Sequence, residues 1–403
     1  MSAGSGRMRC VREVTNEERR ARLAVRHALA ADARVGDPVS ATRAVGVLHA
    51  TEPATVYLSV FARVDAVQVS DIDEALYDQR SLVKQLAMRR TLFVFPRDLL
   101  PAAWGSASAR VAAQLRPRLA KEAEQAGIAE DGAAWLAAAC RAVEDRLADG
   151  SELSAQALRE ELPELGGRLE LGIGKAYGGS FPIAPRVLTQ LGVEARIVRG
   201  RNAGHWRVSR PQWTAMSGWL GEPPVAEEER EGYARLVTVW LGAFGPGTRA
   251  DLQWWLGSTG AAVNRALADV GAVEVGMEGG GQGWLLPEDV EPVRYDQPWA
   301  ALLPVLDPTV MGWKERGFYL GPHGAALFDR NGNAGTTAWW CGRAVGTWVQ
   351  DDAGRVRVRL LEDVGSDGTA ALDREADRLT EWLAGAKVGT VYTSPAMRAG
   401  VSG

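Results

Sequence analysis

The sequence predicts an α+β protein, in which three successive units of helices and a β-hairpin precede a smaller β-barrel-like domain. One observation is a repeated order of capped helices and short β segments up to about residue 292. The other is a change of character from Trp299 on, where short β-rich runs alternate with Gly, Asn and Asp. The chain has 403 residues, more than one domain usually holds. The expected divisions are a disordered tail at 1–14, helix–hairpin units at 15–97, 98–215 and 231–292, a linker at 216–230 and the β-barrel-like domain at 293–403.

The first unit is expected to hold four helices followed by a strand. Thr15 and Glu18 form a T-x-x-E capping box, which opens a helix through about Ala31. The last elements of this unit are expected to be a short helix from Ser70, a further helical stretch at 80–88 and a strand at 89–95.

Two helices of this unit are expected to meet at residues 49–51, His-Ala-Thr. Ser40 can cap the first helix, which would run through about residue 48, and Thr51 can open the second because Pro53 fits a first helical turn. The second helix is nearly all apolar over 56–62 and should be buried. A polar corner between two packed helices can hold side chains rigidly near a surface, so this corner is a candidate site.

His49 and Thr51 allow a structural and a functional interpretation. A histidine near a helix C-terminus is favoured by the helix dipole, and a threonine is an ordinary N-cap. In the functional interpretation the imidazole of His49 orients or deprotonates a water, and the hydroxyl of Thr51 forms a second hydrogen bond to it.

The second and third units repeat the same order of elements. Their expected helices lie at 99–126, 131–148, 155–162, 184–191, 231–241, 249–257 and 261–270, with hairpins inside 194–208 and 273–286. Helices followed by a hairpin with a Gly- or Arg-rich tip describe a winged helix, a helix-turn-helix variant whose hairpin is the wing.

The hairpin of the second unit is the best candidate for binding nucleic acid. The chain has a net charge of −4, so such binding needs a local basic patch. Guanidinium groups bind phosphates in a bidentate manner, and the alternative is a solvated hairpin without a partner. The candidate phosphate or groove contacts are Arg196, Arg199, Arg201, Asn202, His205 and Arg207, with Arg89 and Arg90 as weaker candidates.

Other motifs favour structural roles. The Gly-rich stretch at 172–180 lacks the spacing of a phosphate-binding loop. Three scattered cysteines and four scattered histidines indicate a reducing cytosol and no metal site. No apolar run is long enough to cross a bilayer. Asp307 and Asp329 are expected in a buried ion pair and a turn rather than in catalysis.

Several segments together resemble the winged-helix DNA-binding domain-containing family that includes the AlkZ- and YcaQ-like DNA glycosylases. The segments are VLHATEPATVYLSVFAR, ALYDQRSLVKQLAMRRTLFVFP, FGPGTRADLQWWLG, LLPVLDPTVMGW and RNGNAGTTAWWCGRAVGTW. The resemblance implies three tandem winged-helix units and a C-terminal β-barrel that clasp duplex DNA. It also implies excision of bulky alkylated purines, including unhooking of interstrand crosslinks, in DNA repair or genotoxin resistance, with no cofactor.

The chain departs from this family at the catalytic motif. The family has Gln-x-Gln or Gln-x-Asp at the helix junction, where this chain has His49-Ala50-Thr51. The resemblance therefore implies a monofunctional DNA glycosylase, a monomeric hydrolase of the cytoplasm and nucleoid, with His49 and Thr51 placing the attacking water. The alternative is a winged-helix protein that binds DNA without cutting it, as a lesion protector or a transcription regulator.

Overall fold

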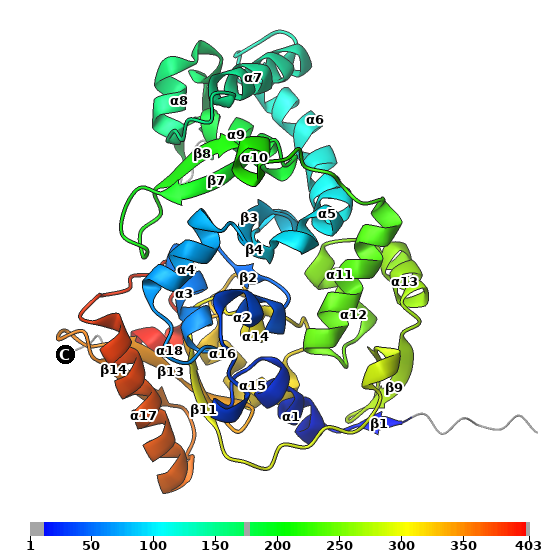
Figure 1. Ribbon diagram of the computed structural model, residues 1–403, viewed down its shortest axis with the longest axis vertical. Coiled ribbons are helices and arrows are strands. Elements are labelled where there is room, and N and C mark those ends of the chain that lie inside the picture. Colours follow the sequence, from blue (N-terminus) through cyan, green and yellow to red (C-terminus); the bar gives the residue numbers. More distant parts are fainter. Residues whose placement is uncertain (1–11, 173–177, 400–403) are drawn as a thin grey trace, which may run out of the picture.

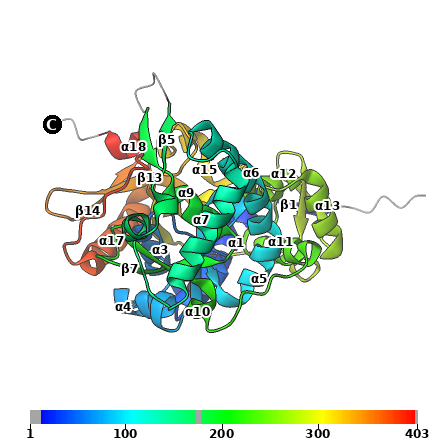
Figure 2. The ribbon, with the colours of Figure 1, turned by 90° about the horizontal axis from the view of Figure 1, so that it is seen from above.

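The computed structural model describes residues 12–172 and 178–399, in which helices are mixed with five small open sheets. Helices α6 to α9 with strands β5 to β8 form a lobe that stands on the rest of the molecule (Figure 1). One hydrophobic core draws on the first unit, the third unit and the C-terminal part, and a second core lies inside the lobe. Seen from above, the β5–β6 hairpin extends outward from this lobe (Figure 2).

The first group of elements surrounds a three-stranded antiparallel sheet in the order β2-β4-β3. Val94 of the central strand pairs with Leu48 on one side and with Lys84 on the other, so these three residues share one face of the sheet. The elements are α1 (Asn16–Arg26), α2 (Pro38–Ala44), β2 (Leu48–His49), α3 (Pro53–Phe61), α4 (Val69–Asp73), β3 (Leu82–Leu86) and β4 (Leu92–Pro96).

Two expectations for the secondary structure of this group are wrong, besides the cap of α3 described below. Ser40 does not cap a helix that reaches residue 48, because Asp37 caps α2 and the chain is extended again at Leu48 and His49, which pair with β4. Residues 80–88 do not form the expected helix, because 82–86 form the strand β3. The partner of β2 lies far along the chain, in β4, so the local pattern around residue 48 does not reveal it. Strand β3 instead pairs with the next strand of the chain, β4, across the short connection 87–91.

The second group contains the lobe, together with the flanking helices α5 and α10. The predicted long helix at 99–126 is present as α5, a π-helical turn and α6, which contains Pro117. Ser154 caps α8 as predicted, since its Oγ accepts the N–H of Ala157 at 3.0 Å. The elements are α5 (Leu100–Ala103), α6 (Ala109–Gln125), α7 (Gly132–Leu147), α8 (Ala155–Glu161), β5 (Arg168–Leu171), β6 (Gly179–Pro182), α9 (Ala184–Val193), β7 (Ile197–Asn202), β8 (Pro211–Ala215) and α10 (Met216–Leu220).

Two features predicted from the sequence belong to this group, the Arg-rich hairpin and the Gly-rich stretch. The Arg-rich hairpin exists, but its second strand begins at Pro211, so residues 205–208, expected in that strand, lie in the connecting loop. Most of the Gly-rich stretch at 172–180 lies outside the described residues.

The third group repeats helices followed by a hairpin. Thr248 caps α12 as predicted, in a reciprocal pair with Asp251. The N-terminal strand β1 joins this hairpin in parallel with β9. The elements are β1 (Glu13–Val14), α11 (Glu229–Phe244), α12 (Arg249–Leu256), α13 (Gly260–Asp269), β9 (Val273–Met277) and β10 (Gln282–Leu285).

The C-terminal part is an antiparallel sheet in the order β11-β12-β13-β14. Among the described residues β11 and β14 are its edges, so the sheet is open rather than closed as a barrel. Helix α17, longer than the expected 373–384, packs against it. The elements are β11 (Ala300–Leu303), α14 (Pro308–Met311), α15 (Gly317–Leu320), α16 (Gly324–Leu327), β12 (Thr337–Trp340), β13 (Arg343–Gln350), β14 (Val356–Leu360), α17 (Gly365–Leu383) and α18 (Pro395–Arg398).

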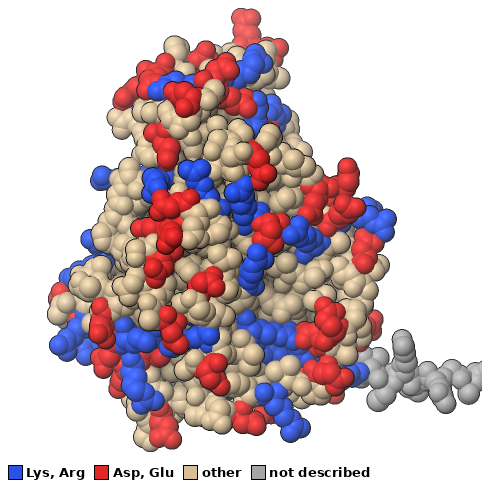
Figure 3. Space-filling model, in the orientation of Figure 1, with Lys and Arg blue, Asp and Glu red and all other residues tan. Residues whose placement is uncertain are grey.

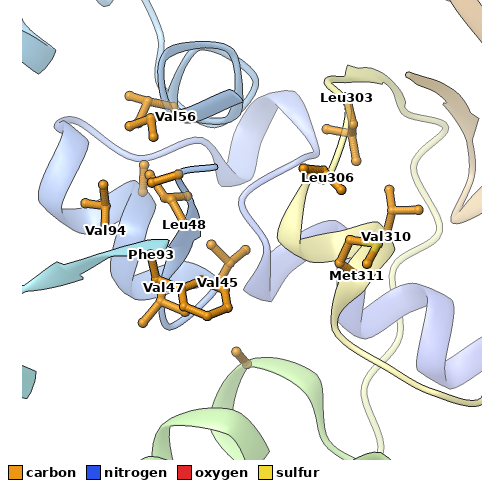
Figure 4. Packing of buried hydrophobic residues seen from close by; sticks show 14 of the residues in the cluster. Val45, Val47, Leu48, Val56, Phe93, Val94, Leu303, Leu306, Val310 and Met311 are labelled. Carbon is orange, nitrogen blue, oxygen red and sulfur yellow. The ribbon is translucent and has the colours of Figure 1, made fainter. Parts of the chain in front are cut away.

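The C-terminal part is fixed to the first group through a shared core and an ion pair. Figure 4 shows Leu48, Phe93 and Val94 of the first sheet in the same hydrophobic cluster as Leu303, Leu306, Val310 and Met311. Arg63, just after α3, pairs with Asp307, and both side chains are 0% exposed. The ion pair expected for Asp307 is therefore confirmed. Asp329 accepts the N–H groups of Asn331 and Asn333, which is the turn expected there.

Candidate active site

A cavity of about 420 Å³ lies where the first sheet meets the lobe. Thr51 and the strand residues Leu86 and Leu92 form one wall, and α6, α9 and β7 form the other. The walls are aliphatic with several guanidinium groups and one carboxylate, which suits a ligand that is partly apolar and partly anionic. The lining residues are Thr51, Leu86, Arg90, Leu92, Leu115, Arg118, Leu119, Glu122, Pro185, Arg186, Thr189, Gln190 and Arg199.

Thr51 reaches the cavity because the chain leaves the sheet directly before it. The N–H of Ala50 donates to the carbonyl of Leu92 at 2.9 Å, which is the last bond to β4. Helix α3 then begins at Pro53 with Glu52 as its N-cap and without a side-chain cap, so the N-cap role expected for Thr51 is wrong. The hydroxyl of Thr51, on an exposed residue, is therefore not used to cap the helix.

His49 lies beside the cavity but is not among its lining residues. Its side chain is 8% exposed, and its ring contacts Phe93 edge-on at a centroid distance of 5.5 Å. Its Nδ1 accepts the N–H of Thr51 at 3.4 Å. Burial, with a smaller effect from the charge of Arg89, lowers the pKa of His49 to about 3.

The imidazole of His49 is therefore neutral at pH 7. Because Nδ1 accepts a hydrogen bond, the ring proton of the neutral form lies on Nε2. A ring in this state donates from Nε2 and does not take a proton there. The geometry favours His49 as the residue that fixes Thr51, rather than as a general base.

The arginines of the predicted basic hairpin fall into two groups. Arg199 lines the cavity, and its burial lowers the pKa of its guanidinium. Arg196 instead forms a bidentate pair with Glu144 of α7, and Arg201 pairs with Asp78. The cavity thus includes only one of these three arginines.

The loop of this hairpin contacts the rest of the protein. The side chain of Asn202 closes the loop, donating to the carbonyl of Val208 at 2.8 Å and accepting from the N–H of Arg210 at 2.7 Å. Arg207 donates to a carbonyl of the C-terminal part, that of Lys387. His205 lies in this loop and is exposed.

Arg89 and Arg90 form the tip of the β3–β4 hairpin. Their φ angles are 54° and 59°, the left-handed region that non-glycine residues adopt at a cost of about 1–2 kcal/mol each. This turn directs Arg90 into the cavity wall, while Arg89 stacks on Trp254 at 3.9 Å. Burial and the nearby Arg316 lower the pKa of Arg89 to about 10.

Sequence reasoning missed the second wall and one buried amine. Arg118 and Arg186 of the lobe both pair with Glu122, and their place beside Thr51 depends on how the lobe sits on the sheet. Lys84, one of only five lysines in the chain, lies in the middle of β3 next to this cavity. The rarity of lysine was the available signal.

The surface and the remaining side chains add three findings. Lys and Arg are interspersed with Asp and Glu over the face in Figure 3, so this face carries no continuous basic field. In the part of the chain that the structure describes, no three or more His, Cys, Asp or Glu side chains gather as metal ligands would. None of the described helices combines the length and apolar character needed to cross a bilayer.

Comparison with known proteins supports both the fold and the family. The family described as DNA glycosylase AlkZ-like matches residues 42–382, a span that includes the whole cavity wall. Among solved structures, the Streptomyces sahachiroi DNA glycosylase AlkZ is similar, with a TM-score of 0.73 and 19% sequence identity. The similarity covers 92% of this chain and 97% of that one, and at this identity it shows the fold. No curated protein matches the chain.

Proposed function

Because the chain belongs to the AlkZ-like family of DNA glycosylases, we propose that it hydrolyses the N-glycosidic bond of bulky alkylated purines, including interstrand crosslinks, in duplex DNA. The observation that carries this proposal is the cavity beside Thr51, whose aliphatic walls suit an apolar adduct and whose guanidinium groups suit the phosphates that flank the base. Its volume of about 420 Å³ lies within the range of small-molecule sites, so it has room for a base that carries an adduct.

Base release from an N-alkylated purine requires few catalytic groups. An N-alkylated purine is cationic and already a good leaving group, so the reaction needs a placed water and electrostatic support for an oxocarbenium-like sugar. The hydroxyl of Thr51 is a hydrogen-bond partner for that water. His49 acts as a positioning residue, since its Nδ1 holds the N–H of Thr51.

The DNA backbone is proposed to bind around the mouth of the cavity. Arg90 and Arg199 line it, and Arg89 lies at the same hairpin tip as Arg90. Guanidinium groups with few acidic partners are suited to phosphate contacts. Three groups of helices, each followed by an antiparallel hairpin, support three tandem winged-helix units as the scaffold for this contact.

The test is base release from a duplex that contains N7-alkylguanine, compared between the wild type and Thr51→Val, which keeps the shape but removes the hydroxyl. The proposal predicts a rate lower by on the order of 100-fold with unchanged DNA affinity. Thr51→Ser, the matched control, should retain most of the rate. Equal base release by the wild type and Thr51→Val would contradict the role of Thr51.

A second candidate is a DNA-binding protein without chemistry, and the weakly basic, mostly buried His49 favours it. Replacement of His49 by Ala separates the two functions. A glycosylase should lose base release in His49→Ala while its DNA affinity stays nearly intact. Tight, salt-sensitive binding without base release in both proteins would favour the binding protein.

A further inference from the structure

Lys84 lies close to the candidate site, but it has no role in the proposed base-release reaction. It projects from the middle of β3 into a narrow cavity, which Ala50 and Pro53 of the Thr51 segment also line. Leu92 and Arg199 belong to both this cavity and the large one, so the two cavities are neighbours. The narrow cavity measures about 20 Å³, room for one small group beside the amine.

The surroundings of Lys84 hold its amine in place and favour its neutral form. Nζ donates to the phenol oxygen of Tyr77 at 2.7 Å and lies 4.6 Å from the centre of that ring. Burial, and then the charge of Arg199, lower the pKa of Lys84 to about 7, and Asp73 acts in the opposite direction. A substantial fraction of the amine is then neutral at pH 7.

A neutral amine beside a second cation in a desolvated pocket is the arrangement that activates lysine for attack on carbonyl carbon. The phenol of Tyr77 remains protonated, since burial and neighbouring charges raise its pKa to about 12. Tyr77 therefore orients the amine and does not take its proton. Tyr57, on the other side of the narrow cavity, donates to Asp73.

We propose that Lys84 is a nucleophile toward the aldehyde of an abasic deoxyribose, so that the protein also acts as an abasic-site lyase. This inference rests on the proposed function, because base release is the reaction that supplies the abasic sugar. It goes beyond hydrolysis and departs from the monofunctional glycosylase that the resemblance implies, since the product sugar becomes bonded to the protein and the DNA strand is cut.

The steps balance without a cofactor. The lone pair of Nζ attacks C1′ of the ring-opened sugar, and the carbinolamine loses water to give a protonated imine. Water removes a proton from C2′, and the electrons of that bond form C2′=C3′ as the C3′–O bond breaks. The 3′ phosphate leaves with those electrons, and hydrolysis of the imine returns the amine of Lys84 and an unsaturated aldehyde.

The test is borohydride trapping of the full-length protein on duplex DNA that already contains a natural abasic site. Such DNA needs no base release, so failure of the lyase and failure of the glycosylase are distinguishable. The variants are Lys84→Met, Lys84→Arg, and Lys121→Gln as a control on the exposed face of α6. Binding of each variant to DNA with a tetrahydrofuran abasic analogue, which has no aldehyde, is measured in parallel.

We expect a covalent protein–DNA adduct with the wild type and Lys121→Gln, and at least a 20-fold lower yield with both Lys84 variants at matched binding. Peptide mass spectrometry of the wild-type adduct should place the reduced sugar on Lys84, a result that needs no variant to fold. Absence of an adduct from wild type bound to abasic DNA would overturn the proposal. An adduct mapped to another amine would overturn it equally.

Discussion

Replacement of Asp307 by Asn tests how the helix that follows Thr51 is held against the C-terminal part. Arg63 and Asp307 are both fully buried, and the guanidinium donates to the two carboxylate oxygens at 2.8 and 2.9 Å. Arg63 also donates to Thr309 Oγ1 and to the carbonyl of Ser59, each at 2.7 Å. Asp307→Asn preserves the size of the side chain but leaves the charge of Arg63 buried without a counter-charge.

The expected loss follows from that uncompensated charge. Breaking a buried ion pair from one side costs about 3–5 kcal/mol. The amide oxygen of Asn can still accept one of the two hydrogen bonds, so a loss of about 3 kcal/mol is expected. For a protein larger than 250 residues, with about 2 °C per kcal/mol, the Tm should fall by roughly 6 °C.

The pH dependence of the stability loss is a second test of the same substitution. Burial alone would raise the pKa of Asp307, but Arg63 and the hydrogen bonds from Ser59 and Thr309 outweigh it and lower the pKa. A carboxyl whose pKa is lowered in the folded state contributes stability that is full above its unfolded pKa of about 4. The difference between wild type and Asp307→Asn should therefore be constant from pH 5 to 8 and narrow as the pH falls below about 4.

The assay is urea unfolding followed by tryptophan fluorescence, with Asp329→Asn as the control. Asp329 is also a hydrogen-bonded aspartate, but it lies in a surface turn where asparagine is accepted. A loss in Asp307→Asn no greater than in Asp329→Asn would refute the reasoning. A loss that stays the same at pH 3 would refute the electrostatic part alone.

The other predictions concern charge at the site. Arg90→Ala should weaken DNA binding and reduce the slope of log affinity against log salt concentration by about one. Arg196→Ala should leave DNA affinity unchanged, because Glu144 already pairs with that guanidinium. Equal losses of affinity in anisotropy titrations of the two variants would contradict this distinction. Since burial and Arg89 lower the pKa of His49 to about 3, its ring is neutral throughout pH 5 to 8, and base release should not titrate with it there. A loss of base release centred near pH 6.5 that disappears in His49→Gln would show that His49 ionises in that range.

Local signals in the sequence predicted three helix caps correctly and two, at Ser40 and Thr51, wrongly. Thr15, Ser154 and Thr248 each accept the N–H three residues later, as their spacing indicates. The two strands read as helix, 48–49 and 82–86, were not predictable in this way. Strand 48–49 depends on pairing with β4, which lies far along the chain. Strand 82–86 pairs with β4 across the short connection 87–91, and its partner was expected to begin at residue 89 and not at 92, which left no room for a hairpin turn.

Three of the residues singled out from the sequence, Thr51, Arg90 and Arg199, line one cavity, and their roles there stay predictions. Arg196 and Arg201 were read as free cations, but each lies against an acid, 52 and 123 residues away in sequence respectively. A composition argument counts charges along the chain, whereas their availability depends on neighbours that only the fold brings together.

The central claim, that this chain excises alkylated bases, is tested most directly by single-turnover base release. The duplex should carry one N7-alkylguanine or a nitrogen-mustard crosslink, with an undamaged duplex of the same sequence as the control. We predict that the wild type releases the damaged base and leaves an abasic site at its position. It should release no base from the undamaged duplex. Tight binding to both duplexes with no abasic site in either would contradict the claim and leave a protein that binds DNA without cutting it.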